Sequence, residues 1–99
     1  MIYLKIHESA GQKVVAACDA GLIGKTLTDG KIYLDLDMHR GFYVGEKTGG
    51  DEVRKALGSF TSANLVGKNA VDVALGMGLA TADGVMYIKR IPYIQIYRI

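Results

Sequence analysis

The N-terminal part of the chain alternates between apolar and polar or aromatic side chains. Residues 2–7 show a period of two, which is typical of a strand that buries one of its faces. Turn residues follow at 9–12. The apolar run at 13–18 then predicts a second strand that pairs with the first, so the sequence predicts an N-terminal hairpin. A four-residue turn would place Cys18 opposite Tyr3 across this hairpin.

The middle of the chain changes from a strand period to a helix period. Alternation returns over residues 31–37, which predicts a third strand, and residues 42–44 could add a short strand between glycine-rich turns. Apolar residues then recur at helical spacing over 51–60 and again over 68–79, which predicts two helices. Residues 59–67 either extend the first of these helices or break it.

The chain closes with two further strands, at residues 85–90 and 93–99. Pro92 separates them and cannot donate to a ladder, so it marks a bend, a bulge or an edge. Strands followed by helices and then by strands predict an α+β fold. We expect an antiparallel or mixed sheet of about five strands, with two helices packed on one face. No linker or repeat interrupts residues 1–99, which predicts a single domain.

Composition excludes several classes of protein. The chain has 99 residues, 49% of them apolar, and a net charge of +2, which fits one ordered domain rather than a disordered segment. A single cysteine cannot form an internal disulfide, so a secreted disulfide scaffold is excluded. No apolar run reaches the ~18 residues of a membrane span, and the charged start does not fit a signal peptide. We therefore expect a cytoplasmic protein with no membrane partner.

One segment partly matches the sequence motif of a phosphate-binding P-loop. Residues 21–26 end in Gly-Lys-Thr, but the first glycine of the full motif would fall where Asp19 stands, and an acid there would repel phosphate. The motif must also open a helix, whereas Gly30 and a strand pattern follow here. The segment is therefore predicted to be a turn, and no cofactor is assigned to it.

Cysteine, histidine and aspartate do not form a recognisable catalytic or metal site. In the predicted hairpin His7 lies about 13 Å along the strand from the position opposite Cys18, which is too far for a base. His39 lies in a glycine-rich loop, and none of these residues shows the paired spacing of metal ligands. Asp35 and Asp37 share one side of their strand, as residues of a solvated face commonly do. No catalytic residue and no metal ligand is assigned.

A broader pattern places tyrosines beside basic and amide side chains on several strands, and residues 85–99 contain no acid. Such a face could stack unpaired bases and hold phosphates, which predicts contact with RNA or a ribonucleoprotein. It could equally be a protein interface or a plain solvated face, since tyrosine favours strands. The net charge is far below that of a basic nucleic-acid-binding domain, and no DNA partner is predicted. The residues of this predicted face are Tyr3, Lys5, Tyr33, Tyr87, Lys89, Arg90, Tyr93, Gln95, Tyr97 and Arg98.

A second candidate site lies between the two predicted helices. Residues 61–69 are largely polar, and a helix N-terminus there could hold an anion with Asn64, Gly67, Lys68 and Asn69. The alternative interpretation makes Asn64 a cap or turn residue for the second helix.

Several short motifs resemble those of one protein family. The motifs are VVAACD at residues 14–19, LIGKT at 22–26, ANLVG at 63–67 and PYIQ at 92–95. Together they are similar to the small archaeal family described as domain of unknown function 424, in the same order and over essentially the whole chain. The resemblance implies a cytoplasmic archaeal protein of about this length and supplies no activity. A histidine often follows the proline in that family, where this chain has Tyr93, so no role is carried over to this position.

Three hypotheses about function follow from the residues. The first is a non-enzymatic binding module that contacts RNA through the tyrosine-rich face. The second is an interaction protein that forms a homodimer through the same face or through an edge strand at Pro92. The third is a small enzyme with a pocket near Cys18, Asn64 and Lys68, which requires those three side chains to converge.

Overall fold

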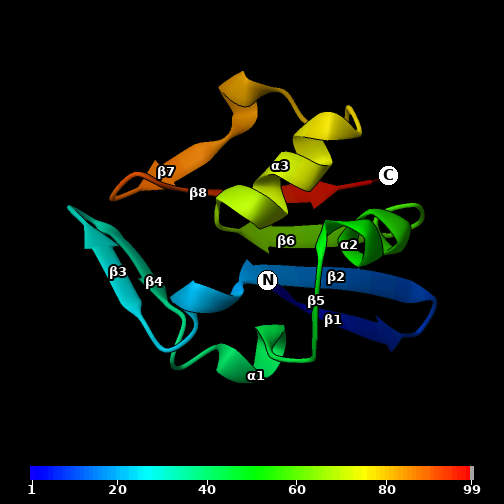
Figure 1. Cartoon of the computed structure of the whole chain (residues 1–99), viewed down its shortest axis with the longest axis horizontal. Coiled ribbons are helices and arrows are strands. Elements are labelled where there is room, and N and C mark those ends of the chain that lie inside the picture. Colours follow the sequence, from blue (N-terminus) through cyan, green and yellow to red (C-terminus); the bar gives the residue numbers. More distant parts are fainter. Residues whose placement is uncertain (99) are drawn as a thin grey trace.

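The computed structural model describes residues 1–98 and contains a six-stranded mixed sheet with helices on one face (Figure 1). Its strand order is β5-β1-β2-β6-β8-β7, and β2 and β6 form the one parallel pair described. The strands are β1 (Ile2–Ser9), β2 (Gln12–Asp19), β5 (Glu46–Thr48), β6 (Ser62–Val66), β7 (Met86–Ile88) and β8 (Ile91–Tyr97). The predicted α+β class with two helices on one face is confirmed, and the last residue of the predicted strand 93–99 lies outside the described part.

The N-terminal hairpin follows the predicted register. Strands β1 and β2 are antiparallel, with Ser9 opposite Gln12 and Tyr3 opposite Cys18. Ala10 and Gly11 both have positive φ, of 51° and 79°, as a two-residue turn of this hand requires.

Strand β6 is the main element that periodicity did not predict. Instead of extending a helix, residues 62–66 form a strand between β2 and β8. Its side chains do alternate, because Ala63 and Leu65 pack on the helix face while Asn64 points to the other side. Because the residues on one side are polar, hydrophobic periodicity did not predict this strand, although it is central to the sheet.

The helix face contains the larger of two hydrophobic clusters. Helices α2 (Gly50–Ala56) and α3 (Lys68–Gly76) cover it, and both are shorter than the predicted spans 51–60 and 68–79. The fully buried residues of this cluster include Val15, Ala17, Val53, Leu57, Leu65, Ala70 and Ala74.

A covering segment, residues 20–45, packs on part of the opposite face. It contains the 3-10 turn η1 (Ala20–Leu22), the hairpin of β3 (Thr26–Asp29) and β4 (Ile32–Asp35), and the short helix α1 (Arg40–Tyr43). Leu36 and Tyr43 are buried there against Ala16, Cys18 and Val66 of the main sheet. The segment therefore completes a second, smaller core.

Two expectations about the covering segment are wrong. The predicted third strand is β4, which pairs with the unexpected β3 in a separate two-stranded sheet and does not join the main sheet. Residues 42–44, predicted as a short strand, instead include the end of α1. Leu27 and Leu34 of the hairpin, and Tyr43 of α1, all pack on the smaller core of the main sheet, and local periodicity does not reveal a partner so distant in sequence.

The closing hairpin turns at Lys89 and Arg90 rather than at Pro92. These two residues have φ of 49° and 68°, and Ile88 pairs with Ile91 directly on either side. Pro92 lies inside β8, an interior strand, so it does not mark an edge. Its carbonyl accepts a 2.8 Å hydrogen bond from the amide of Gly67, whose own carbonyl accepts from Val71. The missing proline N–H therefore costs the ladder no bond at this position.

Strand β2 and helix α3 are tied together by Asp19. Its carboxylate accepts hydrogen bonds from the amides of Asn69, at 3.0 Å, and Ala70, at 2.9 Å, in the first turn of α3. These amides have no partner within the helix, and a negative charge there is favoured by the helix dipole. Gly67 immediately precedes the helix with φ of +100°, and a Cβ at this position would collide with the Asp19 side chain.

We expect Gly67→Ala to lower the free energy of unfolding by about 2 kcal/mol or more, because alanine is strained at this φ and displaces Asp19. Gly21→Ala is the matched control, since a Cβ there meets no atom within 4 Å. Urea denaturation measures both effects.

A double variant tests the cause of that loss. Asp19→Ala alone should cost about 1–2 kcal/mol through the lost cap. Asp19→Ala combined with Gly67→Ala should cost less than the sum, because removing the carboxylate removes the collision. Additive losses would contradict this account of the contact.

Candidate functional site

The structure divides the predicted tyrosine-rich face among several surfaces. Five of its residues point to the sheet face opposite the helices, namely Tyr3, Lys5, Tyr93, Gln95 and Tyr97. Tyr87 lies opposite Pro92 and belongs to the helix face, and Lys89 and Arg90 form the hairpin turn. Tyr33 lies on β4, beside the inward-pointing Leu34, and is 62% exposed. Arg98 places its guanidinium 4.4 Å from the ring centroid of Phe60, which belongs to the helix-face core.

Part of this face is occupied by contacts within the protein. Tyr93 packs partly buried against the smaller core under the covering segment. The Lys5 ammonium donates a 2.8 Å hydrogen bond to the carbonyl of Gly41, and the Lys47 ammonium lies 5.8 Å from the ring centroid of Tyr3. These residues hold the covering segment and β5 in place, and they leave a smaller open area around Gln95.

The open half of the face presents a polar row across two strands. Asn64 of β6 and Gln95 of β8 are direct neighbours, and Gln95 Nε2 donates a 2.9 Å hydrogen bond to Asn64 Oδ1. The hydroxyl of Tyr97 donates to Gln95 Oε1 at 3.5 Å, and Tyr97 is 71% exposed. We call these three residues the amide row. The row fixes the Gln95 amide while leaving further donor and acceptor capacity facing solvent.

A cleft of about 310 Å³ opens where the covering segment ends beside the amide row. Leu34, Phe42 and Tyr43 give it a largely apolar lining, which His39 and Gln95 complete. The ring of Phe42 stacks on that of His7, with centroids 4.7 Å apart and an interplanar angle of 11°. His7 Nε2 donates to the carbonyl of Phe42 at 2.9 Å, because a carbonyl only accepts. The wall of the cleft is therefore held by both stacking and a hydrogen bond.

Acidic side chains of the central strands point away from this cleft. Glu8 and Asp19 lie opposite Lys13 and Ile2 in the hairpin register, on the helix side of the sheet. The open face is accordingly aromatic, amide-rich and weakly basic, and this character suits neutral or anionic ligands.

The predicted anion site is not assembled. Asn64 belongs to the amide row on one face of the sheet, whereas Lys68 begins α3 on the other. The Asp72 carboxylate binds the Lys68 ammonium at 2.8 Å, and this hydrogen bond raises the pKa of Lys68. The amides of Asn69 and Ala70 already bind Asp19. The chain's own carboxylate thus occupies the place at the helix N-terminus where an external anion was expected.

Cys18 lies in an environment that suppresses thiol chemistry. It is 0% exposed, and burial, followed by the charge of Asp19, raises its pKa to about 12. Its Sγ donates to the carbonyl of Asp19 at 3.4 Å. Lys68, by contrast, is exposed on the helix side, so a shared pocket of Cys18, Asn64 and Lys68 is not formed.

The aspartate pair singled out in the sequence stabilises a turn. Asp35 accepts hydrogen bonds from the amides of Asp37 and Met38, at 3.0 and 2.8 Å, and from the hydroxyl of Tyr33 at 3.1 Å. The bond from Met38 is the largest contribution that lowers the pKa of Asp35. Asp37 instead pairs with Arg40.

Two buried acids predict a loss of stability at high pH. Burial raises the pKa of Cys18 from 9.0, and of Tyr43 from 10.0, to about 12 in each case. Between these values the unfolded chain loses protons that the folded chain keeps, so the free energy of unfolding falls as the pH rises from about 9 to 12. Urea denaturation across this range measures the slope.

Tyr43→Phe removes one of the two titrations and should make that slope shallower, and Cys18→Ala should do the same for the other. An unchanged slope in both variants would show that other groups govern the alkaline transition.

Comparisons with known proteins give one family and one related structure. The family model described as "Protein of unknown function (DUF424)" matches residues 7–99. An uncharacterized conserved protein from Methanopyrus kandleri has a similar crystal structure, with a TM-score of 0.80 and 27% sequence identity. The match covers 97% of this chain and 90% of that one. No curated protein matches significantly. Over residues 1–98, no helix has the length and apolar character needed to cross a membrane.

Proposed function

The chain belongs to the DUF424 family of proteins of unknown function, and we propose that it is a non-enzymatic module that binds single-stranded RNA. The amide row and the cleft beside it are the proposed contact surface. The observation that carries the proposal is the combination of an exposed tyrosine, two neighbouring amides and an apolar cleft on one open sheet face.

Each part of this surface matches a part of a nucleotide. Tyr97 offers an exposed ring on which a base can stack, and stacking is insensitive to base identity. Asn64 and Gln95 offer amide groups that can hydrogen-bond to base edges, which unpaired RNA exposes. The cleft of about 310 Å³ lies at the lower end of the size range of ligand pockets and suits a single base.

The few basic side chains on this surface predict that electrostatic attraction contributes little to RNA affinity. Lys5 and Lys47 are the lysines on strands of this face, but they lie on β1 and β5, away from the amide row, and both already make contacts within the protein. If two phosphates are neutralised, the logarithm of the binding constant should fall with the logarithm of salt at a slope of about −1.4. We therefore expect binding governed mainly by stacking and base contacts.

A homodimer is a second candidate, favoured by one observation. β7 is an edge strand of the main sheet, and its Met86 and Tyr87 are 53% and 59% exposed. Unpaired strand edges can pair with a second copy. Light scattering over a range of protein concentrations tests this candidate, which a constant monomer mass would exclude.

The RNA proposal predicts that a labelled, unstructured oligoribonucleotide binds the full chain and raises its fluorescence anisotropy. Tyr97→Ala should weaken this binding by roughly 5- to 150-fold, because base stacking contributes about 1–3 kcal/mol per base. Gln95→Ala should weaken it as well, since the amide row loses its middle member. The titration is run at two salt concentrations.

Tyr33→Ala is the matched control, because Tyr33 is similarly exposed but lies outside the main sheet. It should leave RNA affinity unchanged. Equal losses in Tyr33→Ala and Tyr97→Ala, or no measurable binding at low salt, would refute this surface as an RNA site.

A further inference from the structure

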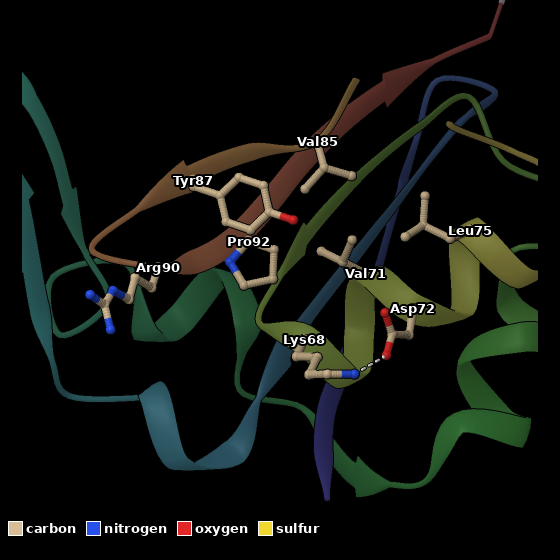
Figure 2. A pocket seen from close by; sticks show the side chains of 8 residues that line it. All are labelled: Lys68, Val71, Asp72, Leu75, Val85, Tyr87, Arg90 and Pro92. Carbon is tan, nitrogen blue, oxygen red and sulfur yellow. Dashed lines mark hydrogen bonds and ion pairs between the residues drawn. The ribbon is translucent and has the colours of Figure 1, made fainter. Parts of the chain in front are cut away.

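A second cavity, of about 290 Å³, lies on the helix side of the sheet, remote from the amide row. Figure 2 shows its position between α3 and the β7–β8 hairpin. Val71 and Leu75 of α3 form one apolar wall, and Pro92 of β8 lies opposite. The groove exists because α3 packs over β6 and β8 and stops short of the edge strand β7.

Tyr87 gives this groove a flat aromatic side. Its ring projects from β7 over the groove near Pro92, as Figure 2 shows, and the residue is 59% exposed. An apolar slot bordered by a tyrosine and a proline ring accommodates a planar ligand group.

Two cationic residues line the groove, one from the hairpin turn and one from α3. Arg90 lines the cavity and extends from the turn, with Lys89 beside it in sequence. Lys68 lines the cavity from α3, where it is paired with Asp72. The charge of Asp19 also acts on Lys68, so carboxylates offset this cation. Arg90 takes part in none of the ion pairs described within residues 1–98, and it therefore supplies the positive charge for a ligand with a negative group.

The turn that carries Arg90 is strained. Lys89 and Arg90 both adopt positive φ, in a two-residue turn that Asn-Gly forms most easily. Such conformations are unfavourable for long side chains, and strain of this kind often occurs at functional sites. Here Arg90, one of the two residues with positive φ, is also a residue that lines the groove.

We propose that this groove binds a phosphorylated aromatic ligand of mononucleotide size. The base lies against Tyr87 and Pro92, and the phosphate binds the Arg90 guanidinium, which suits phosphate geometry. The ligand is either a free mononucleotide or the phosphorylated end of an RNA chain. This inference is independent of RNA binding at the amide row, because the two sites share no residue.

The first test compares related probes by NMR titration of the full chain. Adenosine monophosphate should perturb the amides around residues 87–92 and bind about tenfold or more tightly than adenosine, because a charge-assisted contact to phosphate is lost without it. Inorganic phosphate alone should bind more weakly than the nucleotide. A 5′-phosphorylated oligoribonucleotide that outcompetes the mononucleotide would identify an RNA end as the source; the reverse order would identify a free nucleotide.

A variant can separate binding from folding. Lys89→Asn combined with Arg90→Gly should raise the melting temperature by several degrees, because it relieves the strained turn. The same variant should lose the tenfold preference for the phosphorylated ligand. Arg54→Ala, which removes an exposed cation on α2, is the control and should keep it. Tyr87→Ala should weaken adenosine and adenosine monophosphate alike.

Equal affinity for adenosine and its monophosphate, or equal losses in the turn variant and Arg54→Ala, would overturn the proposal. The amide-row variant Tyr97→Ala should leave nucleotide binding unchanged. The proposals for the two sites can therefore be refuted or supported independently of each other.

Discussion

The carboxylate of Asp19 on the first turn of α3 is the contact on which the arrangement of this protein depends. It joins the end of β2 to the helix that follows β6, next to Gly67, and the amide of Gly67 reaches β8 through the carbonyl of Pro92. These hydrogen bonds thus connect the ends of the interior strands β2, β6 and β8 around Gly67. There is no room for a side chain at Gly67. The position of α3 fixed by these bonds determines where Lys68 and Asp72 lie.

The two faces of the sheet are covered incompletely, and the groove beside Tyr87 and the cleft beside Gln95 lie where the covering elements end. On one face α3 stops before β7, which leaves the groove beside Tyr87. On the other the covering segment stops before the far half of β8, which leaves the cleft beside Gln95. A small sheet with short covers therefore leaves a concave surface on each of its faces.

Periodicity predicted the parts of the fold that depend on neighbours in sequence. The β1–β2 register and the two helices of the helix face follow from such local patterns. Strand β6 was missed because half of its side chains are polar and form the amide row, and the β3–β4 hairpin was misplaced because its burial depends on the main sheet. Alternation also shows which residues of one strand share a face, but not which face that is. Tyr87 and Tyr93 were therefore grouped together, although the tight turn between them directs their side chains to opposite sides.

The parallel pairing of β2 with β6 also has a consequence for the order of folding. The β1–β2 hairpin can form locally within microseconds, but β6 arrives much later along the chain, and Lys13 and Thr61 are 48 residues apart. Until β6 docks, β2 presents an unpaired edge whose residues Val15 to Cys18 are all destined for burial. During synthesis this strand is therefore open to pairing with a neighbouring chain until β6 has formed.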